Sequence, residues 1–127
     1  MSSLGVISGI ISGMILFQTS VVAPIVFTIL DAESASKFLR KIFPRFFLTI
    51  LLFGVLCLSI SLFLKDTQGI IVSSVTIISM SISYLVVPAT NRARDEEKSN
   101  TFRKLHTLTV VLTLFTLLAN LSWLLPI

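Results

Sequence analysis

Four long apolar runs without a single acidic, lysine or arginine side chain dominate this sequence. They cover residues 4–30, 46–64, 69–87 and 105–125. About 20 apolar residues cross the hydrocarbon core of a bilayer as an α-helix, and lipid favours helices for such runs because each backbone group must be satisfied within its own segment. The sequence therefore predicts an all-α integral membrane protein, with residues 1–127 forming one domain built as a four-transmembrane-helix bundle.

The basic side chains gather in two of the three connections between these runs. Nine of the ten Lys and Arg residues lie in the connections 31–45 and 88–104, and only Lys65 lies between the second and third runs. The positive-inside rule then places both basic connections in the cytoplasm and both termini outside, in a bacterial inner membrane. Since these residues flank membrane spans, the net charge of +4 needs no nucleic-acid partner. The opening "MSSLGVISGIISGMILF" has no basic start, so we expect it to belong to the mature first span.

The first basic connection has the pattern of a short interfacial helix. In "DAESASKFLRKIF", Asp31 or Ser34 is suited to cap the helix N-terminus, and basic residues follow later in the segment. Pro44 is expected to stop this helix before the second span begins, because a proline inside a helix removes a hydrogen bond. The sequence thus predicts a separate interfacial helix within residues 31–45.

The second basic connection, "NRARDEEKSNTFRKLH", holds eight of the sixteen charged side chains. Pro88 is expected to end the third span, and Asp95 or Asn100 to cap the helix that leads into the fourth. We expect the segment 91–106 to fold against the 31–45 helix as a structured cytoplasmic cap. In that cap, Arg103 or His106 would bond a carboxylate or a loop carbonyl.

The first span carries a stripe of small residues and two further features. Gly5, Gly9 and Gly13 recur every four residues, which permits close helix approach. We expect them to pack inside the bundle, with a dimer seam as the alternative. Pro24 is expected to kink this long span. Gln18 is the one amide deep within a span, and we expect it to bond a hydroxyl of the third span.

The third span adds a polar face formed by Ser73, Thr76, Ser79 and Ser83. Such hydroxyls usually bond their own backbone or bridge helices, but together with Gln18 they could also line a solute path. Met14, Cys57 and Met80 lie near mid-span on three helices, and their sulfur atoms would suit a soft metal if they converged. We expect them to fill the core or face lipid instead, and we predict no metal and no cofactor.

Three stretches in order resemble the transmembrane protein 205-like domain, found in eukaryotic transmembrane protein 205 and in small bacterial membrane proteins. They are "FQTSVVAPIVFTIL", "KIFPRFF" and "YLVVPATNRARDE…TFRKLHTLTVVLT". The family's prolines, its Pro-x-Thr and its Phe-Arg-x-x-His match the residues Pro24, Pro44, Pro88, Thr90, Phe102, Arg103 and His106. The asparagine that members often carry seven residues after the histidine is Thr113 here. The resemblance implies a four-span membrane protein without a settled activity.

We expect a non-enzymatic function, because neither the spans nor the loops hold a nucleophile–base pair. The favoured hypothesis is an interaction or accessory protein, which is either a homo-oligomer or a small subunit of a larger membrane complex. The alternative is a small transporter or solute-handling protein that uses Gln18 and the polar face of the third span. The absence of intramembrane charge favours the first hypothesis, since proton relays and voltage sensors need ionisable groups in the membrane.

Overall fold

The computed structural model describes residues 2–125, and these fold into helices joined by short turns. In order, they are α1 (Ser3–Phe17), the π-helical turn η1 (Gln18–Val22), α2 (Ala23–Ile29), α3 (Ala32–Leu64), α4 (Thr67–Leu85), α5 (Val87–Asp95), α6 (Ser99–Leu121) and the short 3-10 turn η2 (Ser122–Leu124). Four helical stretches, Ser3–Ile29, Ala32–Leu64, Thr67–Asp95 and Ser99–Leu124, are long and apolar enough to cross a membrane. The predicted all-α bundle with four membrane spans is confirmed.

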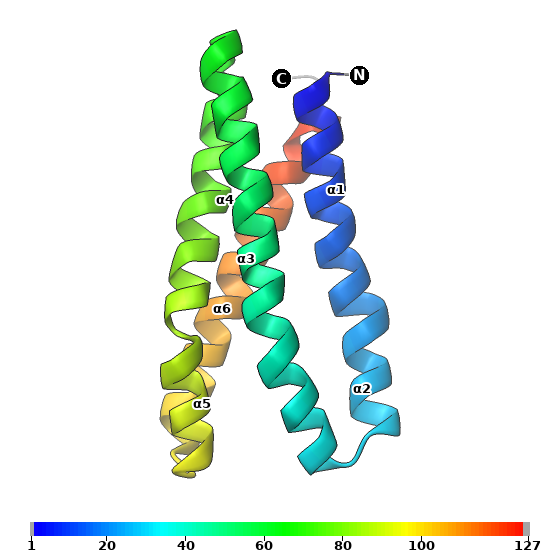
Figure 1. The fold of residues 1–127 in the computed structure, drawn as a ribbon, viewed down its shortest axis with the longest axis vertical. Helices are drawn as coiled ribbons and strands as arrows, with labels where there is room; N and C mark the ends of the chain where they lie inside the picture. Colours follow the sequence, from blue (N-terminus) through cyan, green and yellow to red (C-terminus); the bar gives the residue numbers. More distant parts are fainter. Residues whose placement is uncertain (1, 126–127) are drawn as a thin grey trace.

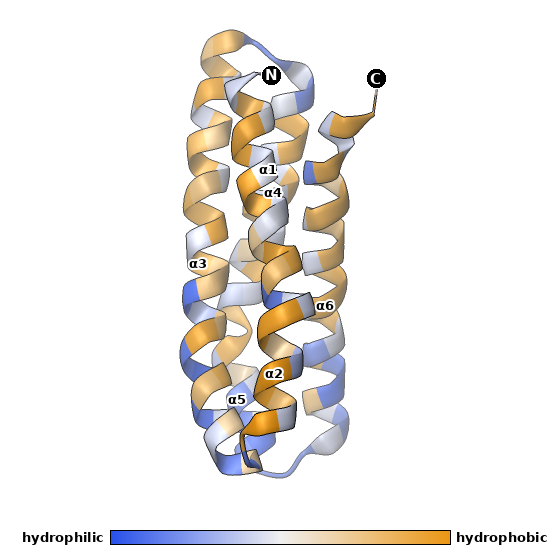
Figure 2. Ribbon diagram, turned by 90° about the vertical axis from the view of Figure 1, so that its right-hand side faces the viewer, coloured by the Kyte–Doolittle hydropathy of each residue, from blue (hydrophilic) through white to orange (hydrophobic). Residues whose placement is uncertain are grey.

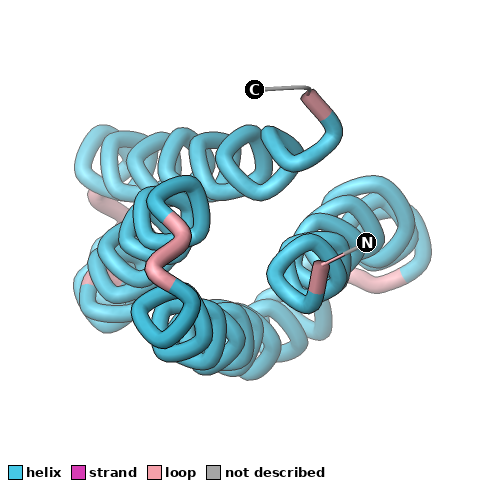
Figure 3. Tube along the Cα trace, turned by 90° about the horizontal axis from the view of Figure 1, so that it is seen from above, coloured by secondary structure: helices cyan, strands magenta, loops and turns pink. Residues whose placement is uncertain are grey.

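The four spans run up and down, so the two termini lie at one end and both basic connections at the other (Figure 1). Figure 2 shows the hydrophilic residues gathered at the end away from the termini, around α5 and the connections. We call this the charged end. Around the bundle each span packs on two others, in the order α1, α3, α4, α6 and back to α1 (Figure 3). The same-side placement of the termini agrees with the even number of predicted spans.

The predicted interfacial helix is wrong as a separate element, because α3 runs without interruption from Ala32 through Pro44 to Leu64. Its 33 residues extend over about 50 Å. Pro44 removes one hydrogen bond, yet buried side chains anchor the helix on both sides of it, with Leu39 before and Phe47 after. Packing on both flanks therefore overrides the local preference of proline to end a helix.

The ends of two helices follow the sequence pattern more closely. The Asp31 carboxylate accepts a hydrogen bond from the Ser34 N–H at 2.7 Å, which caps α3 and lowers the pKa of Asp31. At the other predicted boundary α4 ends at Leu85, and Pro88 lies in the first turn of α5, where a missing N–H costs nothing. The break before Pro88 is confirmed, but the chain resumes its helix at once.

Pro24 produces a π-helical turn rather than a simple kink. The Ala23 N–H donates to the Gln18 carbonyl, five residues back, and Pro24 follows in the first turn of α2. The wider turn makes room for the proline ring, which would otherwise press on the preceding turn. In Figure 1, α2 continues in the general direction of α1.

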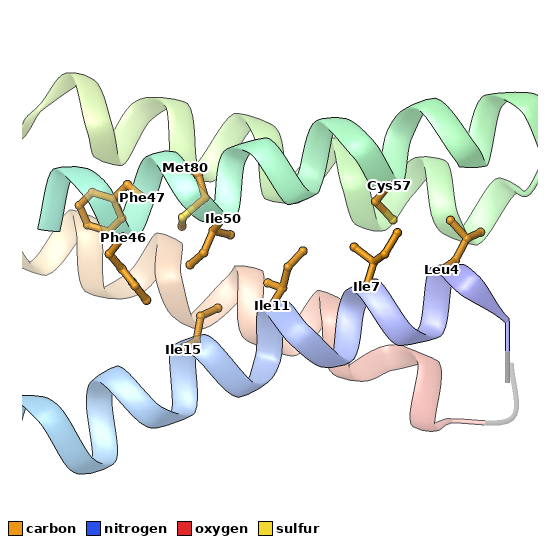
Figure 4. Close-up of a cluster of buried hydrophobic side chains, with 9 residues drawn as sticks. All are labelled: Leu4, Ile7, Ile11, Ile15, Phe46, Phe47, Ile50, Cys57 and Met80. Carbon is orange, nitrogen blue, oxygen red and sulfur yellow. The ribbon is translucent and has the colours of Figure 1, made fainter. Parts of the chain in front are cut away.

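One apolar cluster holds α1 against the rest of the bundle. Leu4, Ile7, Ile11 and Ile15 project from α1 toward α3, and Met80 joins them from α4 (Figure 4). The α3 members of the cluster are Phe46, Phe47, Ile50 and Cys57. Cys57 lies beside Ile7, whereas Met80 lies beside Ile50, so the thiol and thioether sit at different levels and do not converge as a soft-metal site (Figure 4).

A close helix contact lies between the end of α3 and the start of α4. Gly69 is buried in the first turn of α4, where an added Cβ atom would lie 2.9 Å from Leu4 Cδ1 and 3.0 Å from Ser61 Cβ. Gly54 is a milder case, with its Cβ position 3.0 Å from Thr76 Cγ2. Glycine at these two positions lets α3 and α4 approach closely.

Candidate functional site

A bidentate salt bridge joins α3 and α5 at the charged end of the bundle. The Arg40 guanidinium donates to both carboxylate oxygens of Asp95, with a distance of 3.1 Å from Nη1 to Oδ2. The hydrogen bond from Arg40 lowers the pKa of Asp95, and the same bond raises the pKa of Arg40. This ion pair agrees with the prediction that the 91–106 segment folds against the 31–45 segment.

A turn after α5 sets the direction of α6. Glu97 adopts the left-handed conformation with φ 56°, the Glu97 N–H donates to the Arg94 carbonyl, and the Lys98 N–H donates to the Ala93 carbonyl. These bonds form the common C-terminal stop of a helix. The residue before α6 is Lys98, which offers no side-chain cap, so the prediction of Asp95 or Asn100 as the cap is wrong.

Three side chains stack between α5 and α6. The Arg94 guanidinium carbon lies 5.3 Å from the centre of the Phe102 ring, a cation–π geometry. On α6 the rings of Phe102 and His106 are nearly parallel, with centroids 5.8 Å apart and an interplanar angle of 4°. The expected hydrogen bond from Arg103 or His106 to a carboxylate or loop carbonyl is not formed within residues 2–125, so that prediction is wrong. His106 is held by ring stacking instead.

This stack borders a cavity of about 380 Å³ at the charged end. The cavity opens to the surface, and its walls combine two arginines, one carboxylate, a hydroxyl and the stacked rings. The lining residues are Ala93, Arg94, Glu97, Ser99, Phe102, Arg103 and His106. We call it the α5–α6 cavity. Most of its exposed lining is apolar, and its charged groups are two arginines and one carboxylate. It therefore suits a ligand that combines an anionic group with apolar surface better than a cation.

Thr90 helps to start α5 rather than to bind anything. Its hydroxyl donates to the Val86 carbonyl at 2.8 Å, the same carbonyl that the Thr90 N–H reaches. With Pro88 two residues earlier, this bond stabilises the first turn after the break in the helix. The structure thus gives Thr90 and Pro88 a local structural role.

The interior of the bundle contains many polar side chains. Buried hydroxyl or amide side chains occur on all four spans, at Ser8, Ser12, Gln18, Ser61, Ser73, Thr76, Ser79, Ser83, Thr116 and Asn120. Several of them bond only their own helix; the Ser73 hydroxyl, for example, donates to the Gly69 carbonyl at 2.6 Å. We call these ten residues the buried polar set. The four residues of the polar face of the third span, Ser73, Thr76, Ser79 and Ser83, all lie in the interior of the bundle.

One hydrogen bond of the buried polar set joins two spans. Asn120 Nδ2 donates to the Thr76 hydroxyl at 2.9 Å and to the Thr116 carbonyl at 2.8 Å. Asn120 was not among the residues expected to matter from the sequence, although Thr113, Thr116 and Asn120 follow at helical spacing on one side of α6. That spacing was the available signal. The side chain acts as an interhelical link between α4 and α6.

Several buried polar atoms of the set have no hydrogen-bond partner within residues 2–125. Gln18 is buried, but its Nε2 atom has no hydrogen-bond acceptor in the part of the chain that the structure describes, so the expected bond to a hydroxyl of the third span is not formed. Within the same residues, Ser8 Oγ, Ser12 Oγ, Ser83 Oγ and Asn120 Oδ1 also lack a partner. Buried polar atoms nearly always have a hydrogen-bond partner, so these positions indicate polar partners in the interior that residues 2–125 do not supply.

The small-residue stripe of α1 is turned away from the bundle. Gly9 and Gly13 are exposed, and a Cβ atom at either would meet nothing within 4 Å. Gly5 is only partly buried. The buried side of α1 is instead formed by Leu4, Ile7, Ser8, Ile11, Ser12 and Ile15. The prediction that the glycines pack inside the bundle is therefore wrong for Gly9 and Gly13, which leave an open strip along the outside of α1.

The fold and its surface define an integral membrane protein of the four-helix class. All four spans expose large apolar side chains, such as Phe17, Phe63, Ile78 and Phe115, and the charged residues are kept to the ends. Such an outer surface suits contact with lipid chains rather than water.

The chain belongs to the family described as "Domain of unknown function (DUF4149)", which matches residues 6–99. The match includes the first three spans, α5 and the turn before α6. No curated protein and no solved structure matches the chain significantly.

Proposed function

We propose that this protein is a non-enzymatic accessory protein of the bacterial inner membrane that associates laterally with other membrane helices, as a homo-oligomer or as a small subunit of a larger complex. The observation that carries the proposal is the outward strip at Gly9 and Gly13, where an added Cβ would meet no atom of residues 2–125 within 4 Å beyond the nearby backbone of its own helix. In lipid, helices associate through close van der Waals packing, and small residues four apart permit it.

The burial of the spans supports the same proposal. In the most apolar stretch of each span, 28–33% of residues are buried for the first three spans but only 11% for the fourth. The fourth span therefore leaves most of its surface for lipid or for another protein. No carboxylate, lysine or arginine lies within the four predicted spans, which argues against ion-coupled chemistry in the membrane.

The proposal also covers the orientation of the chain in the membrane and its relationship to a second protein family. The connections that carry nine of the ten basic residues are assigned to the cytoplasm, with both termini outside. The ordered prolines, together with Phe102, Arg103 and His106, support a relationship with transmembrane protein 205-like domains.

The test exploits the empty space beside the strip. Gly9→Leu and Gly13→Leu are expected to leave the folded monomer intact, so any effect on assembly reports on another chain. Ser59→Leu, on the outer side of α3, is the matched control, since Ser59 is exposed and bonds only the Val55 carbonyl of its own helix. Gly54→Leu is the control for a disrupted fold, because its Cβ position touches Thr76.

Assembly is measured after gentle extraction from native membranes, by cross-linking, by particle size and by co-purified proteins. The proposal expects Gly9→Leu to lose the assembly while keeping the unfolding midpoint of the wild type, and Ser59→Leu to lose neither. An assembly unchanged in Gly9→Leu and Gly13→Leu would show that the strip faces only lipid. A second copy and a foreign subunit are told apart by the identity of the cross-linked partner.

The buried polar set favours a second candidate function, the passage of a small polar solute. Ser8, Ser12 and Ser83 carry hydroxyl oxygens without a partner in residues 2–125, from two different spans. Cysteines introduced at these three positions in a Cys57→Ser background would be tested with a water-soluble thiol reagent. Labelling of all three would support a hydrated path, whereas protection of all three would leave the hydroxyls as helix contacts and exclude the path.

A further inference from the structure

Two of the three consecutive acids near the α5–α6 cavity are paired with basic residues outside it. Asp95 is engaged by Arg40, and Glu96 lies 3.5 Å from Lys98. Arg94 and Arg103 line the cavity, and neither has a carboxylate within ion-pair distance in the described chain. Glu97 is the one acid in the wall. The cavity thus carries two arginines against one carboxylate.

The Arg94 side chain is held in place by contacts within the protein. Its guanidinium lies over the Phe102 ring, and Phe102 is stacked in turn on His106. A guanidinium held by stacking on its face keeps its N–H groups free at the edge for an anion. Arg103 and His106 are three residues apart on α6, so they face the same way and bring further donors to the same wall.

The backbone contributes to the same site. α6 starts at Ser99, which lines the cavity, and no side chain caps this helix start. The first N–H groups of a helix have no partner within it and carry the positive end of the helix dipole. A cavity that combines this helix start with two arginines and a hydroxyl has the features of a phosphate site.

The surface next to the cavity indicates which kind of molecule would carry the phosphate. His106 lies at the start of the apolar stretch of α6, and Val110 and Leu114 follow it at four-residue spacing on the same side. Both are half exposed, at 50% and 52%. A ligand with a phosphate in the cavity would therefore have an apolar track leading from it into the bilayer. Basic recesses between membrane helices commonly hold anionic lipid headgroups.

We propose that the α5–α6 cavity binds the phosphate of an anionic phospholipid, with Arg94 and Arg103 as the principal ligands and the acyl chains along α6. The site is separate from the outward strip of α1, so it does not depend on the proposed lateral association. Glu97 limits the affinity, because its carboxylate repels the phosphate.

The experiment uses the whole protein in nanodiscs of phosphatidylcholine that contain an increasing fraction of phosphatidylglycerol. Retained lipid is counted by native mass spectrometry. Arg94→Gln and Arg103→Gln are each expected to weaken retention about tenfold, as for loss of one hydrogen bond to a charged group. Glu97→Gln is expected to strengthen retention about twofold, since a nearby repulsion is removed. Lys41→Gln and Lys104→Gln remove exposed cations of the same end outside the cavity, and should change retention little.

Each variant is first shown to keep the wild-type unfolding midpoint, and Arg103→Lys serves as a charge-conserving variant. Equal weakening in the two lysine controls would overturn the proposal in favour of diffuse attraction to a basic surface. Weaker retention in Glu97→Gln would also overturn it. Inorganic phosphate and glycerol 3-phosphate form the soluble arm of the experiment. If either displaces the retained lipid at micromolar concentration, the natural ligand is a soluble phosphate and not a lipid.

Discussion

Replacing Gly69 by alanine should destabilise the bundle through the contact between α3 and α4. The new Cβ would stand 2.9 Å from Leu4 Cδ1 and 3.0 Å from Ser61 Cβ, with the Ser61 hydroxyl closer still. Carbon atoms prefer separations of about 3.5–4.0 Å, so the helices must move apart by roughly half an ångström or more. Overpacking of this kind costs about 1–3 kcal/mol.

Gly9→Ala is the matched control, because the Cβ added there meets nothing within 4 Å. Alanine favours a helix over glycine by up to about 1 kcal/mol, and both variants share that gain. The difference between Gly69→Ala and Gly9→Ala therefore isolates the packing cost. The two free energies of unfolding are measured by circular dichroism in mixed micelles with an increasing fraction of dodecyl sulfate. If they agree within about 0.3 kcal/mol, which is the limit of additivity for independent sites, the close approach at Gly69 is refuted.

Three further predictions address other parts of the structure. A double-mutant cycle between Asn120→Leu and Thr76→Val, measured by the same unfolding assay, should give a coupling of about 0.5–1.5 kcal/mol; no coupling would mean that α4 and α6 are not linked there. The folded pKa of Asp95 lies below its ordinary value of 3.8, so its ion pair contributes stability above that pH, and this stability is lost as the pH falls through the folded pKa. The unfolding midpoint of Asp95→Asn should therefore drop less than that of the wild type between pH 7 and pH 3. An equal drop would contradict the pairing. In a cysteine-free background, a cysteine at Thr67 should be labelled from outside and one at Glu97 only after permeabilisation, whereas the reverse pattern would invert the proposed topology.

Local sequence signals predicted two helix boundaries correctly, but they missed the start of α6, where neither Asp95 nor Asn100 is the cap. The Asp31 cap and the break before Pro88 both depend on one or two neighbouring residues. Pro44 shows where such reasoning fails, because the packing of Leu39 and Phe47 carries α3 straight through it. A local preference of a few kcal/mol is decided by the contacts on either side, which a single sequence does not display.

The candidate sites divide in the same way. The sequence shows the accumulation of charge in residues 91–106. It also led to the correct prediction that this segment contacts the 31–45 segment. The partners themselves were not visible. Arg40 with Asp95, and Arg94 over Phe102, depend on the rotation of three helices about their own axes. The turn at Glu97 sets the direction of α6 and thereby creates the α5–α6 cavity.

By itself the sequence determined that the chain crosses a membrane four times, with its termini on one side and its charges at the ends, because lipid excludes charge and demands helices. Only the tertiary structure decided which side of each helix is buried. In water an apolar face marks the core, but in lipid the outer surface is apolar as well, so periodicity no longer separates the two. That is why Gly9 and Gly13 could be expected inside and lie outside, while Asn120 was overlooked and lies in the core.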